Sequence, residues 1–274
     1  MLLPGTLLLI DSEEEYFPEE ILKLHSDVTT QGLSLIVCAD WYDLDVINRV
    51  KFFDENTRDF WEAATGGANV PALNDLLQPY GIALGGKVLR GNIKGKGNQQ
   101  TLFRSGNALV QFPTGGRVHY ARLKDESKSF LGQGNNHIVE AAILGLYQSS
   151  NKGDKEERDT RSDSGSGSGG SGSGSGRVIV YGDSNCLDSS HIVFPCYWLL
   201  LDLVQYASTK VLGLNLQSMT HEVTDLDALG SATALNTFQP KRRKNPFLME
   251  KASKVLQGKV GMDSHHQKCD AQSF

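Results

Sequence analysis

Three acidic residues follow apolar, strand-like runs in this sequence: Asp11, Asp40 and Asp183. The carboxyl ends of parallel strands lie along one edge of a sheet, where α/β folds usually bind ligands. Convergence of these three carboxylates with Asn69 and His191 at that edge would make a site for a hard cation or a sugar-like small molecule. Asp before a helix is also a preferred N-cap, because its side-chain oxygen accepts from free backbone N–H groups. Of these two interpretations we favour structural capping, and the ligand site is the alternative.

A Gly-rich turn at residues 65–69 leads into a predicted helix. The free N–H groups at a helix N-terminus can hold an anion. Two adjacent glycines, Gly66 and Gly67, are equally what a tight turn against a neighbouring strand requires. The stretch has no Lys and no complete phosphate-loop pattern, which favours the tight turn.

Cys38 follows a strand-like run, at the position where an amidotransferase-like enzyme carries its nucleophile. Such a nucleophile sits on a tight elbow between small residues. Here no glycine flanks it, and no His–Glu pair is evident downstream. We therefore interpret Cys38 as a buried structural cysteine, which behaves as a small hydrophobe.

The sequence supplies no serine-protease triad. His191 is the one histidine in predicted ordered sequence with acids and hydroxyls near it, and those neighbours all lie in the same turn. A triad instead joins residues from separate strands or loops. G-x-S-x-G matches within the Ser/Gly tract lack the strand and helix that this motif needs. We predict no catalytic residue and no peptidase activity for the chain alone.

Composition excludes several other classes of protein. The 27 basic and 32 acidic residues give a net charge of -5, which provides no long-range attraction to nucleic acid. No apolar run approaches the roughly 20 residues that span a bilayer, so we expect no membrane insertion. The start of the chain resembles a strand more than a signal peptide, and we find no targeting signal.

The four cysteines lack zinc spacing, and no metal or other cofactor is expected. The basic cluster 241–244 is interpreted as a solvated patch rather than a localisation signal.

Apolar runs alternate between strand-like and helical patterns. Strands are predicted at 6–10, 33–38 and 178–181, helices at 18–28, 70–80 and 197–206, and short antiparallel strands within 85–123. Continuous apolar strands alternating with helices predict an α/β fold with a mainly parallel sheet and helices on both faces.

The domain is expected to cover residues 1–212. Residues 151–176 form a charged and then Ser/Gly-rich insertion, which we interpret as a flexible loop between two hairpin strands. The pattern fades beyond residue 212, and 213–274 is predicted to be a mostly disordered tail.

Cys186 and Cys196 bracket a short loop before the predicted helix at 197. In an oxidising compartment a disulfide between them would fix this loop, whereas in the cytosol both would stay reduced.

Several strings together resemble the site-1 protease family, membrane-anchored subtilisin/kexin-type convertases of the secretory pathway. These strings are residues 5–21, 40–42, 50–58, 65–74, 143–147 and 181–191. The resemblance is to the region after the protease domain, and it implies a flavodoxin-like or class I amidotransferase-like module.

This resemblance implies a non-catalytic accessory domain whose partners are the parent protease domain or other secretory-pathway proteins. It implies the lumen of the Golgi or endoplasmic reticulum as location, and it favours a disulfide between Cys186 and Cys196. Family members cleave membrane-bound transcription-factor precursors with residues of an upstream domain, none of which matches a position here. Because the sequence starts at a strand, we also expect the module to be incomplete at its N-terminus, with an exposed sheet edge.

Overall fold

The fold is described here from a computed structural model. It describes residues 5–49, 51–63, 65–126, 137–149, 175–188 and 195–224. All of these residues belong to the unit Met1–Asn236.

Three parallel strands form one end of the large sheet, with β1 (Thr6–Ile10) at its edge. β1 pairs with β2 (Ser34–Cys38), and β2 pairs with β11 (Arg177–Tyr181). Every residue of β2 and β11 is buried. This is the pattern of parallel strands covered on both faces, and it explains why their sequences are apolar after the first residue.

Antiparallel strands extend the sheet beyond β11, in the order β10, β9, β6 and β7. Their bounds are β10 (Ile138–Gln148), β9 (Arg117–Asp125), β6 (Leu89–Lys94) and β7 (Gln100–Gly106). β8 (Leu109–Gln111) pairs with β10 and with β5 (Ala83–Leu84), and β12 (His221–Glu222) pairs with β9. The α/β class and the antiparallel strands within 85–123 are confirmed. The sheet is mixed, because these hairpin-connected strands continue the parallel part.

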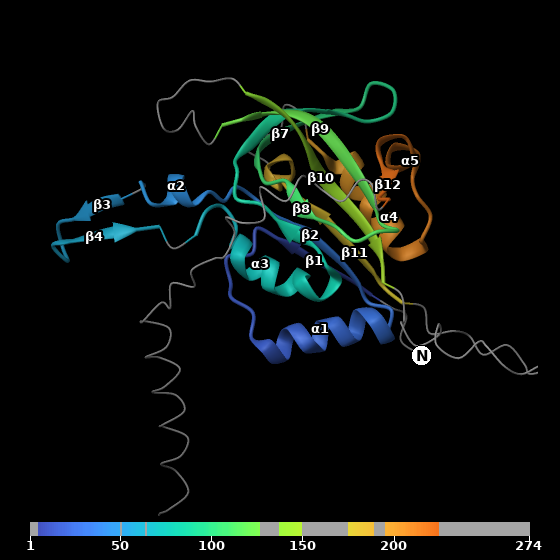
Figure 1. Cartoon of the computed structure of the whole chain (residues 1–274), viewed down its shortest axis with the longest axis horizontal. Helices are drawn as coiled ribbons and strands as arrows, with labels where there is room; N and C mark the ends of the chain where they lie inside the picture. Colours follow the sequence, from blue (N-terminus) through green and yellow to red (C-terminus); the bar gives the residue numbers. More distant parts are fainter. Residues whose placement is uncertain are drawn as a thin grey trace, which may run out of the picture. The chain divides into compact units, whose positions relative to one another are not determined.

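Helices cover both faces of the sheet (Figure 1). α1 (Pro18–Thr30), α3 (Val70–Leu77) and the 3₁₀ turn η1 (Gln78–Tyr80) lie on one side. α4 (Tyr197–Thr209) and α5 (Leu214–Met219) lie on the other. Successive side chains of the parallel strands point to opposite faces of the sheet, so each strand contributes to two cores. The core under α4 contains Ile36 and Ile179 from the sheet and Leu199 and Leu203 from the helix.

Two side chains of the sheet hold the C-terminal end of α4. Both the hydroxyl of Ser34, at 2.8 Å, and the guanidinium of Arg177 donate to the carbonyl of Ala207. The last carbonyls of a helix have no partner inside the helix, so these bonds satisfy an otherwise unpaired group. The chain then leaves the helix through Lys210, in the left-handed conformation with φ 67°.

The ordered domain continues past the expected boundary at residue 212. Leu216 and Met219 of α5 are buried in the core, and β12 adds its residues to the sheet beside β9. The predicted hairpin around the Ser/Gly insertion is present, since β10 and β11 pair antiparallel up to Gln148 and Arg177. Most of the insertion, the tail from residue 225 on and the basic cluster 241–244 lie outside the described residues.

A small hairpin forms a second sheet of its own. After α2 (Leu44–Ile47), β3 (Lys51–Asp54) pairs antiparallel with β4 (Asp59–Glu62). Figure 1 shows this hairpin apart from the large sheet. Among the described helices, none has the length and apolar character required to cross a bilayer.

Candidate functional site at the carboxyl edge of the parallel strands

The polar residues that follow β2 and β11 meet at one edge of the sheet. The side-chain amide of Asn185 donates to Oδ1 of Asp40 at 2.6 Å and to Oδ1 of Asp183 at 2.7 Å. Ser105, from β7, donates its hydroxyl to Asp40 at 3.2 Å and lies 3.0 Å from the same amide. One amide therefore links two carboxylates from different strands.

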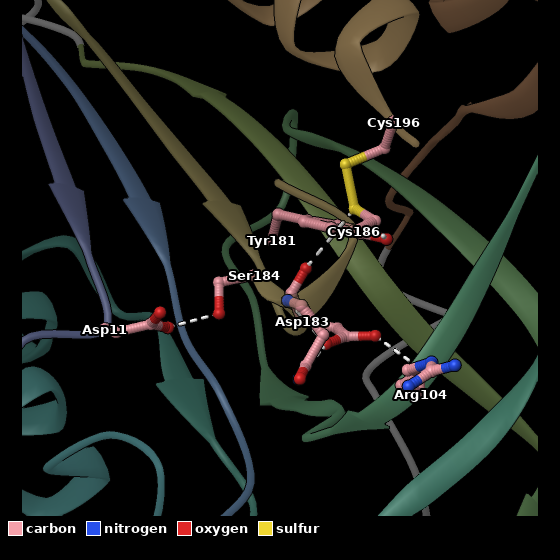
Figure 2. The surroundings of a disulfide bond; sticks show 8 residues. Asp11, Arg104, Tyr181, Asp183, Ser184, Cys186 and Cys196 are labelled. Carbon is pink, nitrogen blue, oxygen red and sulfur yellow. Dashed lines mark hydrogen bonds between the residues drawn. A yellow bond between two sulfur atoms is a disulfide. The ribbon is translucent and has the colours of Figure 1, made fainter. Parts of the chain in front are cut away.

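Asp183 is fully buried. Its carboxylate accepts from the backbone N–H of Asn185 at 3.0 Å and from the backbone N–H of Arg104 (Figure 2). Burial raises the pKa of Asp183 to about 6, and the nearby Asp40 carboxylate adds to the rise. The hydrogen bonds act in the opposite direction because they stabilise the ionised form, but burial outweighs them.

Asp11 ties the β1 loop to the β11 loop. Its carboxylate accepts from the hydroxyl of Ser184 (Figure 2), and its own N–H donates to the carbonyl of Cys38 at 3.1 Å. The residue has φ 49°, a left-handed conformation that non-glycine residues seldom adopt outside Asn and Asp. Partial burial raises the pKa of Asp11, against the effect of the Ser184 hydrogen bond.

The Gly-rich turn lies directly against Asp40. A Cβ atom on Gly67 would lie 2.2 Å from Oδ2 of Asp40, and one on Gly66 would lie 2.1 Å from the carbonyl oxygen of Trp41. The N–H of Gly67 donates to that same carbonyl at 2.9 Å. Close packing against the strand end accounts for both glycines, as the tight-turn interpretation expects.

Asn69 acts as the N-cap of α3. Its side-chain oxygen accepts from the N–H of Ala72 at 3.2 Å, and its amide lies 3.3 Å from the carbonyl of Glu13. It therefore joins α3 to the loop after β1. His191 lies outside the described residues, so its predicted place in this site stays a prediction.

The cluster contains two members that sequence reasoning missed. Ser105 arrives from an antiparallel strand, and no local pattern marks it as a partner of Asp40. Asn185 stands two residues after Asp183, so its position in the same turn was a usable signal. An Asp side chain in a turn typically accepts from the backbone N–H two residues on, which brings that residue close to the carboxylate.

Cys38 lies beneath this edge rather than on it. Its side chain is 1% exposed, and burial, followed by the charges of Asp11 and Asp183, raises the pKa of its thiol to about 12. The thiol is therefore protonated near neutral pH, whereas nucleophilic attack requires the thiolate.

Three histidines of the described ranges make contacts outside the carboxylate cluster. Nδ1 of His119 lies 2.9 Å from the carbonyl of Met219, His221 stacks on Tyr120, and His25 packs against a tyrosine ring. In the ranges that the structure covers, no histidine joins the carboxylate cluster.

Cys186 and Cys196 form a disulfide with a Cα–Cα distance of 5.2 Å (Figure 2). The N–H of Cys196 also donates to the carbonyl of Cys186 at 3.2 Å. Because Cys186 follows the Asp183 turn directly and Cys196 is the N-cap of α4, the bridge fixes the polar edge to the start of that helix.

The carboxylates that converge here are bonded mainly to the chain's own donors. Asp40 accepts from the backbone N–H of Trp41 at 2.7 Å in addition to its side-chain partners. Within the described part of the chain, no group of three or more His, Cys, Asp or Glu residues is arranged to hold a metal ion. Binding of a cation or small molecule at this edge stays a prediction.

Comparison with known proteins places this edge in a family context. Residues 3–221 match the family described as "MBTPS1, fourth GATase-like domain". The chain is 44% identical over 212 residues to "Subtilisin-like protease SBT6.1" of Arabidopsis thaliana, covering 76% of the chain and 18% of that protein. It is 38% identical over 257 residues to "Membrane-bound transcription factor site-1 protease" of Homo sapiens, covering 94% of the chain and 22% of that protein.

The chain thus spans about a fifth of the length of these relatives. A solved structure, "mmIFT52 N-terminal domain", aligns with a TM-score of 0.44 at 14% identity over 76% of this chain and 79% of that chain. The family match covers most of the sequence and nearly all described residues, including the whole carboxylate edge. The chain belongs to the MBTPS1 fourth GATase-like domain family.

Proposed function

We propose that this chain is a non-catalytic module of a site-1-protease-like subtilisin-type protein, and that it supports the protease domain or presents it to partners in the secretory pathway. The observation that carries the proposal is the self-contained hydrogen bonding at the carboxyl edge. The amide of Asn185 donates to both Asp40 and Asp183 at the place where an α/β enzyme would hold its substrate.

Two further features support a structural role. The thiol of Cys38, the nucleophile that an amidotransferase-like activity would use, is buried and has its pKa raised to about 12. The disulfide between Cys186 and Cys196 suits the oxidising lumen in which such a protein would act. The names of the relatives support the connection to proteolysis, which in this proposal belongs to another domain of the polypeptide.

The first test is a peptidase assay on the purified chain. We expect no cleavage of a fluorogenic peptide with a basic and hydrophobic cleavage site. Reproducible cleavage that a serine-protease inhibitor abolishes would contradict the proposal.

The second test places the chain in a full-length context. In the Homo sapiens relative, the 257-residue matched region is replaced by this chain, or by a Gly/Ser linker as the deletion control. We expect the chimera to retain peptide cleavage and thermal stability close to the parent, and the deletion control to lose both. A deletion control that equals the parent would show that the module does not support the protease.

A ligand at the carboxyl edge is tested by thermal shift with Ca²⁺ and with neutral sugars. A shift that disappears in Asp183→Ala would favour a binding module over the accessory role. No shift in the parent would remove the ligand hypothesis.

A further inference from the structure

The β3–β4 hairpin exposes four aromatic side chains. Phe52, Phe53, Phe60 and Trp61 are each between 51% and 65% exposed. From the usual size of aromatic side chains, they leave on the order of 400 Å² of apolar surface in water. The total is comparable with the largest apolar patch of a typical monomer, although it is divided between the two faces of the hairpin, and large exposed apolar surfaces are often functional.

The aromatic residues occupy both faces of the ribbon. Phe52 lies opposite Trp61 in the register, and Phe53 lies opposite Phe60. Successive residues of a strand point to opposite faces, so each face carries one cross-strand pair. Phe53 and Phe60 pack edge to face with ring centroids 5.3 Å apart. These pairs stabilise the hairpin, but they leave about half of every ring uncovered. A surface that covers both pairs must enclose the ribbon in a cleft.

The tip of the hairpin is acidic. Asp54, Glu55 and Asp59 face a single cation there, Arg58. Asp54 accepts from the hydroxyl of Thr57 at 2.8 Å, which closes the turn and lowers the pKa of this carboxyl. Anionic lipid would repel such a tip. A complementary protein surface would instead carry Lys or Arg at its rim.

The size of the patch selects the occupant. A stable complex between separate proteins buries about 800 Å² on each side, roughly twice what these rings offer. A surface of the same polypeptide needs less area because the covalent link raises its effective concentration. About four fifths of the length of the curated relatives lies outside this chain and can supply that surface.

We propose that the β3–β4 hairpin is the docking element of this module, and that it inserts into an apolar, Lys/Arg-rimmed cleft in another part of the same site-1-protease-like polypeptide. The inference rests on the proposed accessory function and names the surface through which it operates.

A photo-crosslinker tests the partner directly. Benzoylphenylalanine replaces Phe60 in the chimera with the Homo sapiens relative, and replaces Leu201, an exposed residue of α4, in a matched control. We expect position 60 to crosslink to segments outside this chain in the same polypeptide, next to basic residues, and position 201 to give at least about fivefold less of that product. Crosslinks between two polypeptides, to lipid, or only within this chain would each overturn the proposal.

Protection of the hairpin tip gives an independent measurement. Trypsin is expected to cleave after the exposed Arg58 at least about 10-fold more slowly in the chimera than in the isolated chain. Phe53→Ser/Phe60→Ser is expected to remove the protection, since buried aromatic anchors typically change affinity by about 30-fold. Leu201→Ser/Val204→Ser, two exposed positions of α4, is the matched control and is expected to leave it within twofold.

A charge variant separates docking from folding of the hairpin. Glu55→Gln keeps both aromatic pairs, so a hairpin that merely unfolds in the serine variant cannot explain its effect. We expect Glu55→Gln to raise cleavage after Arg58 about two- to fivefold in the chimera and not in the isolated chain. An equal effect in both contexts would overturn the proposal.

The two proposals fail separately. Crosslinks from position 60 together with a deletion control that works like the parent would leave the docking in place and remove the supporting role. A chimera that needs the module but is unaffected by the hairpin variants would keep the supporting role and remove the docking through the hairpin.

Discussion

The side-chain amide of Asn185 donates to Asp40 across 2.6 Å, although the two residues are 145 positions apart in the chain. The same amide also bonds Asp183, so it separates two carboxylates that would otherwise repel each other. This contact holds the loops after β2 and β11 together at the point where a ligand site would open. It motivates the first prediction.

Asn185→Ala is expected to destabilise the domain by about 2–4 kcal/mol. The variant removes the donor shared by two carboxylates and leaves partly buried acceptors without compensation. Urea unfolding monitored by circular dichroism measures the change. Asn92→Ala, at an exposed position of β6, is the control and should stay within about 0.5 kcal/mol of the parent. Equal stability of the two variants would show that the amide bridge contributes little.

The sequence predicted the three parallel strands well, because strands of this kind are almost continuously apolar. From the geometry of strand ends it predicted that Asp11, Asp40 and Asp183 lie along one edge of the sheet, and their role as a ligand site stays a prediction. It did not predict what those carboxylates bond to. Ser105 comes from β7, whose place in the sheet depends on long-range antiparallel pairing, and such pairing has no local signal. The helix α5, with six residues, and the strand β12, with two, were missed because such short elements carry too little periodicity to distinguish them from a tail.

The stability of the domain is expected to depend on Asp183 between about pH 4 and pH 6. Burial raises the pKa of this carboxyl to about 6 in the folded state, against about 3.9 in the unfolded chain. Over this interval the folded state therefore binds more protons than the unfolded state, and stability falls as pH rises. The full difference is on the order of 3 kcal/mol.

Urea midpoints measured from pH 4 to pH 7.5 test this dependence. In Asp183→Asn the contribution of this group should vanish, which flattens the curve. Asp11 also has a raised pKa, so a slope of the same sign remains. A parent whose stability instead rises through pH 6 would show that the hydrogen bonds from Arg104 and Asn185 outweigh burial.

Removing the disulfide is expected to reduce stability by about 2–3 kcal/mol. The bridge closes a loop with a sequence separation of 10, and the gain follows from the reduced entropy of the unfolded chain. The double variant Cys186→Ala/Cys196→Ala, compared with the parent in thermal unfolding, measures it. Dithiothreitol should lower the transition of the parent and leave that of the double variant unchanged. A parent that dithiothreitol does not affect would mean that the two thiols are not bridged in the purified protein.

Cys38 is expected to be inert in the folded protein. With its pKa raised to about 12, its thiolate fraction near neutral pH is about a thousandfold below that of an ordinary solvent-exposed cysteine with a pKa of 9.0, and the side chain is 1% exposed. In a Cys269→Ser background, Cys38 is the free thiol available to Ellman's reagent. We expect almost no reaction in buffer and one equivalent in urea.

The same background tests the amidotransferase hypothesis for Cys38. A catalytic thiol must reach both its substrate and a base, and this thiol lies beneath Asp11 and Asp183, whose negative charges disfavour its ionisation. We therefore expect no glutaminase activity in the parent and no difference in Cys38→Ala. Two results together would contradict this expectation: rapid labelling of Cys38 in the folded protein, and glutamine hydrolysis that is lost in Cys38→Ala. They would mean that the structure around the end of β2 opens during turnover and exposes the thiol.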